Sequence, residues 1–156
     1  GGFYVTAPPL YRHTNTIYYF TQIYNPVTVP VGYTYSIMEN FWITSTARAY
    51  PKLPYEKMKD DILGKKYSVS LAFIGGIRAQ ALNKKHRGKD YTPNVLSFPL
   101  DTHLGEIFIT PTIAKKEAHK FEMTHKGYIG FLFVHACLHL KGLDHGDVMD
   151  KAEKKW

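Results

Sequence analysis

The residues best suited to chemistry are three histidines late in the sequence, His135, His139 and His145. His135 and His139 are four residues apart, so on a helix their imidazoles lie on one face, about a turn apart. Gly142 can adopt the left-handed conformation that ends a helix, after which the chain can bring His145 back toward the other two. Nitrogens from all three could then bind one ion at about 2.0–2.1 Å each. The spacing therefore predicts a three-histidine metal site.

Such a ligand set is typical of catalytic zinc, because three protein ligands leave a fourth position open for water. A water bound there has a pKa of about 7, so we expect hydrolytic chemistry. Zinc is the favoured ion, although nickel or copper can occupy the same ligands. The alternative is a set of core histidines that bond to backbone carbonyls. Cys137 would point away from His135 across the helix, and we expect it to be a buried apolar residue rather than a ligand.

Zinc peptidases with the motif H-E-x-x-H-x-x-G-x-x-H share this spacing. The histidines and the glycine match, but Ala136 stands where the peptidases have a glutamate. That glutamate is their general base, and alanine cannot move a proton. The sequence therefore predicts the metal ligands of a peptidase without its proteolytic base.

The elements that position these residues follow from apolar runs and turn residues. Strands are expected at 41–45, 67–74, 95–98 and 106–110, and helices at 54–63, 77–85, 113–121 and 128–141. Pro99 is expected to stop the third strand. The last helix is apolar almost all round, which is typical of a helix at the centre of a domain. Because strands and helices alternate irregularly, the predicted fold class is α+β: a small mixed sheet packed against several helices, with a central apolar helix that carries two metal-binding histidines.

The first 37 residues differ in composition from the rest. They contain one charged side chain, Arg12, together with seven tyrosines and four prolines. We expect residues 1–37 to be a tyrosine-rich appendage to a domain at 38–156, and Met38 could be the native start. The alternative is an ordinary strand pair that completes the fold, since alternation at 17–20 and 27–29 favours strands or a hairpin.

The overall charge favours polyanionic partners. The net charge is +7 with the histidines neutral, which suits nucleic acid or ribosomes as well as anionic membrane surfaces. No apolar run reaches the roughly 18 residues of a membrane span, so no membrane is expected. The single cysteine excludes an internal disulfide framework and fits a reducing cytoplasm. Nothing in the sequence predicts an oligomeric state.

Three blocks of the sequence resemble the YbeY family of bacterial zinc-binding endoribonucleases that mature rRNA. Residues 135–145 match H-G-x-L-H-L-x-G-Y-D-H, and residues 82–99 match L-N-x-x-Y-R-G-K-D-x-x-T-D/N-V-L-S-F-P. Residues 105–109 match G-D/E-I-x-I, and the blocks occur in the family's order. The resemblance covers roughly residues 38–156. Departures from the pattern stand at His86, Thr92, Pro93 and Leu143.

The resemblance implies a cytoplasmic, zinc-dependent endoribonuclease that acts in rRNA maturation and ribosome quality control, with RNA and the ribosome as partners. It implies that Arg87 is catalytic, and a guanidinium can indeed grip a phosphate and stabilise charge that develops on it. The neighbouring lysines could neutralise the RNA backbone, or could simply be solvated: Lys84, Lys85 and Lys89. Either water or the ribose hydroxyl could be the nucleophile.

Other readings of the same residues stay open. The chain could be a metal-dependent hydrolase of protein or small molecules, although Ala136 argues against it, or a non-catalytic ribosome-associated factor in which metal stabilises the fold. Asp144 could orient a ligand imidazole or cap a turn. Asn94 and Ser97 could touch substrate, but both also suit the end of a strand.

Overall fold

A computed structural model describes residues 11–13, 16–18, 40–47 and 49–155, and the chain divides into two units, Gly1–Glu39 and Asn40–Trp156. In the first unit, β1 (Tyr11–His13) pairs antiparallel with β2 (Thr16–Tyr18). The strand expected at 27–29 lies outside the described residues. An appendage at 1–37 and a native start at Met38 stay predictions.

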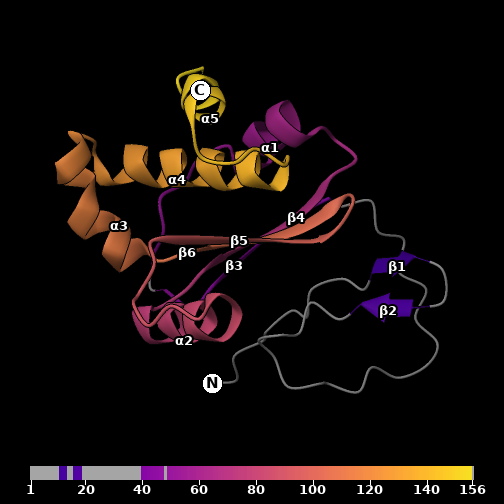
Figure 1. Ribbon diagram of the computed structural model, residues 1–156, viewed down its shortest axis with the longest axis horizontal. Helices are drawn as coiled ribbons and strands as arrows, with labels where there is room; N and C mark the ends of the chain where they lie inside the picture. The colour runs from indigo at the N-terminus through magenta and orange to yellow at the C-terminus, as the bar shows by residue number, and fades with distance from the viewer. Residues whose placement is uncertain (1–10, 14–15, 19–39, 48, 156) are drawn as a thin grey trace. The chain divides into compact units, whose positions relative to one another are not determined.

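A four-stranded mixed sheet in the order β3-β4-β6-β5 forms the centre of the second unit (Figure 1). The strands β3 (Phe41–Ser45), β4 (Ser68–Phe73) and β6 (Leu104–Ile109) are parallel, and β5 (Val95–Asp101) runs antiparallel along β6. Every residue of β6 is buried. Continuous burial is expected of a central strand covered on both faces, which explains why its sequence reads as an apolar run.

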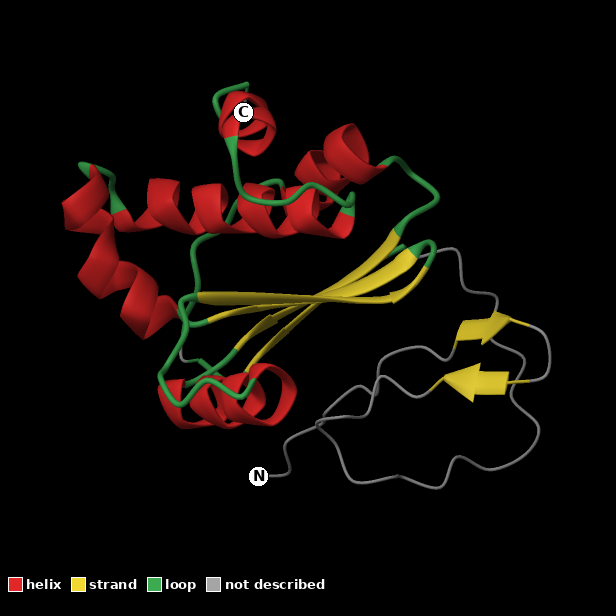
Figure 2. Cartoon of the chain, viewed as in Figure 1, coloured by secondary structure: helices red, strands yellow, loops and turns green. Residues whose placement is uncertain are grey.

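Helices cover both faces of this sheet (Figure 2). On one face lie α4 (His125–Leu140) and α1 (Tyr55–Leu63), and on the other lies α2 (Gly76–Arg87). The helices α3 (Pro111–Glu117) and α5 (Asp147–Glu153) pack against α4. The observed architecture confirms the predicted α+β class, with the apolar helix at its centre.

Alternate residues of the central strands serve the two faces. Val69, Leu71 and Phe73 of β4 are fully buried in one cluster with Phe133 of α4. On the opposite face the ring of Phe98 in β5 packs against that of His86 in α2, at 5.1 Å between ring centres. Burial on both faces fixes the register, because a one-residue slip would turn every side chain to the wrong side.

The C-terminal end of α4 lies very close to β6. A Cβ atom on Gly105 would stand 2.7 Å from Cδ2 of Leu140. Any larger residue at position 105 would have to displace the Leu140 side chain. Beyond the helix, Gly142 takes a φ of +95° and its amide donates to the carbonyl of His139 at 2.9 Å. The helix therefore ends where the sequence predicts, and the chain reverses toward His145.

The elements differ from the prediction most clearly in three places. The expectation that Pro99 stops its strand is wrong, since β5 continues to Asp101. Proline is tolerated there because β5 is an edge strand, where a missing N–H breaks no bond to a further strand, and the register shifts just beyond it. The helix expected at 113–121 is divided into α3 and a 3₁₀ turn, η1 (Ala118–Phe121). No apolar pattern marked the short helix α5, and only the family resemblance implied a closing helix after His145.

Among the described residues, no helix is both long and apolar enough to cross a membrane.

Candidate metal centre and the cleft around it

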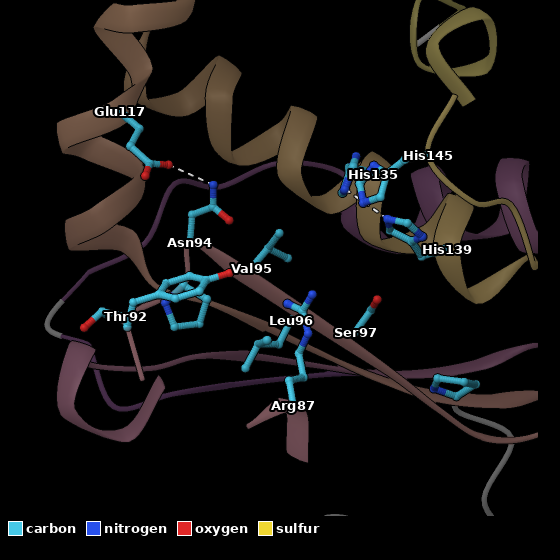
Figure 3. A pocket seen from close by; sticks show the side chains of 13 residues that line it. Arg87, Thr92, Asn94, Val95, Leu96, Ser97, Glu117, His135, His139 and His145 are labelled. Carbon is cyan, nitrogen blue, oxygen red and sulfur yellow. Dashed lines mark hydrogen bonds between the residues drawn. The ribbon is translucent and has the colours of Figure 1, made fainter. Parts of the chain in front are cut away.

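The three predicted histidines lie together. Nε2 of His135 and Nε2 of His139 are 3.1 Å apart on one face of α4. His145, from the turn after Gly142, offers a third nitrogen, and the three donor atoms all lie within 4.8 Å of one another (Figure 3). The structure therefore brings the residues of the predicted metal site to one point.

Hydrogen bonds to Nδ1 of His135 and of His139 determine which nitrogen of each ring faces this point. Nδ1 of His139 lies 2.9 Å from the carbonyl oxygen of Leu143, which can only accept, so Nδ1 carries the proton. Nδ1 of His135 lies 2.5 Å from Oε1 of Glu153, a carboxylate that also accepts. In the neutral rings both Nε2 atoms then carry lone pairs. This arrangement, with an outer partner on the second nitrogen, is typical of metal-ligating histidines.

Two lone pairs that face each other at 3.1 Å repel unless a proton or a cation lies between them. A proton is disfavoured, because burial lowers the pKa of His139 and the neighbouring His135 and His145 lower it further. The donor set therefore fits a metal ion. A core histidine bonded only through a backbone carbonyl would not turn its second nitrogen toward another imidazole.

The groups that hydrogen-bond to the ligand histidines differ from the one predicted from the sequence. Asp144 was a candidate to orient a ligand ring, but the partners observed are Glu153 and the Leu143 carbonyl. Glu153 lies on α5, eighteen residues beyond His135. Nothing in the sequence pointed to it, because α5 is short and lacks an apolar repeat. Cys137 is buried with a pKa raised by that burial, as expected of an apolar core residue.

The histidines open into a cleft of about 650 Å³. Its wall combines charged, polar and apolar side chains: Arg87, Tyr91, Thr92, Pro93, Asn94, Val95, Leu96, Ser97, Pro99, Glu117, His135, His139 and His145. Figure 3 shows the imidazoles at one side, Asn94 and Glu117 at the other, and Arg87 below them, with its guanidinium at the level of β5. The cleft thus runs along the edge strand.

Arg87 is the last residue of α2, and Gly88 ends that helix in the left-handed conformation with a φ of +66°. The next loop is tied to the helix by Asn83, which is fully buried and donates from Nδ2 to the carbonyl of Tyr91 at 3.0 Å. One glycine and one buried amide therefore position both Arg87 and the loop that forms the cleft wall. The family resemblance of residues 82–99 predicted a role for Arg87, but the role of Asn83 was not predicted.

The three candidate lysines are exposed, and none belongs to the cleft wall just given. Lys84 forms an ion pair with Asp90, 2.8 Å between Nζ and Oδ2. Hydrogen bonds from Lys84 and Gln80 lower the pKa of Asp90. Lys85 and Lys89 flank the same turn. A role for these lysines in binding RNA stays a prediction.

Asn94 and Ser97, weighed as substrate contacts from the sequence, both line the cleft. Asn94 donates to Glu117 at 2.8 Å and to the hydroxyl of Tyr128 at 3.2 Å. Neither Glu117 nor Tyr128 could be inferred from the sequence, because these contacts join residues 23 and 34 positions apart.

Comparison with known proteins identifies the family. The model of a family described as Endoribonuclease YbeY matches residues 42–155. The chain belongs to the YbeY family. Curated relatives named Endoribonuclease YbeY include that of Alkaliphilus oremlandii, 40% identical over 89 residues (51% of this chain, 59% of the relative). That of Alkaliphilus metalliredigens is 37% identical over 100 residues (57% of this chain, 64% of the relative).

The alignments thus span less than two thirds of these YbeY relatives. The fold also resembles a solved structure, the solution structure of TM1509 from Thermotoga maritima. It aligns with a TM-score of 0.55 and 28% identity, over 74% of this chain and 85% of that one. The YbeY resemblance predicted from three sequence blocks is confirmed. Residues 82–99 and 135–145 both contribute to the cleft wall, and 105–109 lie in β6 beside it.

Proposed function

We propose that this chain is a metal-dependent endoribonuclease that cleaves RNA phosphodiesters. One observation carries the proposal: in a member of the YbeY family, a single cleft joins a three-histidine donor set to an exposed arginine. We propose rRNA as the substrate, the ribosome as the partner and the cytoplasm as the location. The net charge of +7 and the lone cysteine support these assignments.

His135, His139 and His145 would hold the ion, which we propose to be zinc. When bound, the ion would supply Lewis-acid chemistry by stabilising negative charge that develops on the reacting phosphate. Glu153 and the Leu143 carbonyl keep the two α4 imidazoles turned toward the ion. Arg87 binds the phosphate from the other side of the cleft, because its planar guanidinium can donate two parallel hydrogen bonds to phosphate oxygens.

The experiment compares zinc content and cleavage of an rRNA fragment in the wild type and four variants. Arg87→Ala should keep zinc and lose about 10²-fold or more in cleavage rate. Arg87→Lys should recover little of the cleavage rate, since an ammonium keeps the charge but cannot donate two parallel hydrogen bonds to a phosphate. His139→Ala should lose zinc and cleavage together. His119→Ala, an exposed histidine of η1, is the matched control and should change neither.

Full cleavage by Arg87→Ala would contradict the role of this arginine. A wild type that binds zinc but never cuts RNA would favour the alternative of a non-catalytic ribosome-associated factor. The products also identify the nucleophile: a 2′,3′-cyclic phosphate indicates the ribose hydroxyl, and a 5′-phosphate indicates water. A hydrolase of protein is disfavoured, because Ala136 is 1% exposed and offers no base.

A further inference from the structure

Three side chains from a loop and two helices form a closed ring of hydrogen bonds at the side of the cleft away from the histidines. Asn94 precedes β5, Glu117 ends α3 and Tyr128 lies in the first turn of α4. Nδ2 of Asn94 lies 2.8 Å from Oε2 of Glu117 and 3.2 Å from the hydroxyl of Tyr128. The hydroxyl of Tyr128 lies 3.1 Å from the same Oε2. Neither the metal site nor Arg87 uses this ring.

The carboxylate determines the direction of all three bonds. Glu117 can only accept, so the hydroxyl of Tyr128 must donate to it. The oxygen of Tyr128 is then left to accept from Asn94, and Asn94 must present its NH₂ group to both partners. Its carbonyl oxygen, Oδ1, therefore faces away from the ring, as Figure 3 shows. The ring holds a hydrogen-bond acceptor in one orientation on the cleft wall.

Each of the parts of this ring that pack inside the protein is held by further contacts. The backbone carbonyl of Asn94 accepts from the amide of Thr110 at 2.9 Å. Tyr128 is 2% exposed, and its ring stacks on Phe121 and on Phe131, with ring centres 5.1 and 6.0 Å away. Burial, with a further contribution from Glu117, raises the pKa of the Tyr128 hydroxyl to about 12, so it keeps the proton that it donates. Asn94 therefore cannot turn over without breaking the ring.

We propose that Oδ1 of Asn94 determines specificity by accepting a hydrogen bond from the exocyclic amine of an unpaired adenine. The inference rests on the proposed function, and it requires a base that is not paired. In a duplex that amine is engaged in pairing, and the major groove of A-form RNA is too narrow for side chains to read. Tyr91 lines the same cleft with its side chain half exposed, which suits stacking of a base.

The first experiment needs no variant. The zinc-loaded full chain is titrated with hexaadenylate and with a hexamer of purine riboside, which keeps the stacking surface but lacks the exocyclic amine. Fluorescence anisotropy is read before cleavage becomes detectable. Hexaadenylate should bind about 3- to 10-fold more tightly, the worth of one hydrogen bond. Equal affinities would overturn the proposal. If 2′-fluoro substitution lowers the affinity instead, Asn94 reads the ribose and not the base.

Variants then test the ring. Asn94→Ala should weaken binding of hexaadenylate to the level of the purine riboside hexamer, and a preference that survives this change overturns the proposal. Glu117→Gln should reduce the preference, because the glutamine amide can donate to Asn94 and let it turn over. Glu117 is thus a positioning residue, and Glu56→Gln, exposed on α1, is its matched control.

Failure of this inference is distinguishable from failure of the proposed function. A wild type that cuts rRNA without preferring either hexamer retains the nuclease proposal and loses the base-reading site. A wild type that neither binds the hexamers nor cuts rRNA overturns both.

Discussion

Glu153 is not one of the predicted metal ligands, but its contact with His135 should affect how tightly the site binds zinc. Its carboxylate accepts from Nδ1 of His135 at 2.5 Å, and its side chain is only 14% exposed. Replacing it with alanine would leave the imidazole free to rotate and to exchange its tautomer. We expect Glu153→Ala to bind zinc about 10- to 100-fold more weakly, the usual cost of losing an outer partner. Competition with a chelator of known affinity measures this change.

The matched control for Glu153 is Glu56→Ala, which removes an exposed carboxylate from α1. Unchanged zinc affinity in Glu153→Ala, with the fold intact by circular dichroism, would contradict the positioning role.

His139 makes the metal-free chain sensitive to acid. Its pKa lies below the ordinary value of 6.5, mainly because of burial. As the pH falls below 6.5 the unfolded chain therefore takes up a proton that the folded chain refuses, and stability declines with decreasing pH. We expect the melting temperature in the presence of chelator to be lower at pH 5.5 than at pH 7.5, about one unit on either side of that ordinary value.

His139→Gln should flatten this pH dependence, and His119→Ala should keep it. A melting temperature that rises on acidification would contradict the assignment, because it would mean that the folded chain binds the extra proton.

At the scale of elements, the contact between β6 and α4 supports the metal ligands. Leu140 lies against Gly105 and directly follows His139. Gly105→Val should force the end of α4 away from the sheet, with a loss of stability of about 1–3 kcal/mol for the overpacking and weaker zinc binding. Chemical denaturation and zinc titration measure the two effects.

Gly75→Ala is the control for this contact, since an added Cβ there meets nothing within 4 Å. If Gly105→Val weakens stability but leaves zinc affinity unchanged, the contact supports the fold and not the ligands.

The elements that could be predicted are those with a strong local signal. Helix α4 is apolar almost all round and ends at Gly142, so its position and its two histidines follow from the sequence. Helix α5 has seven residues and one buried side chain, Met149, which is too weak a pattern to detect. Strand β5 can continue through Pro99 because it lies at the edge of the sheet. No local sequence pattern shows which strand lies at an edge, so this continuation could not be predicted.

Some residues of the candidate site could likewise be predicted from the sequence, and others could not. The histidines and Arg87 belong to continuous blocks, so spacing and family resemblance could place them. Glu117, Tyr128 and Glu153 join the site through contacts between distant positions. Such contacts depend on the tertiary fold, and the sequence offered no spacing from which to infer them.

At the scale of the whole molecule, the net charge of +7 predicts RNA binding that weakens steeply with salt. The lysines near Arg87 should contribute unequally to RNA binding, because their charges are not equally available. Lys84 is already paired with Asp90, whereas Lys89 forms no ion pair with another described residue. Lys89→Ala should therefore reduce the slope of log K against log salt by about 0.7, the value for one phosphate of a single strand.

Lys84→Ala should change that slope less, because its charge is already balanced. Anisotropy titrations of a single-stranded RNA at several salt concentrations measure both slopes. Equal reductions in the two variants would mean that the pair with Asp90 opens when RNA binds.

The contact between His135 and Glu153 has one more consequence, for the way the molecule opens. Zinc held by His135 and His145 would join the turn at 141–146 and helix α5 to α4, so that they could no longer unfold separately from it. Zinc should therefore slow amide hydrogen exchange at 142–153 far more than in β6, every residue of which is already buried. Exchange measured by mass spectrometry with and without zinc would reveal this, and Glu153→Ala should uncouple α5 while leaving the turn protected.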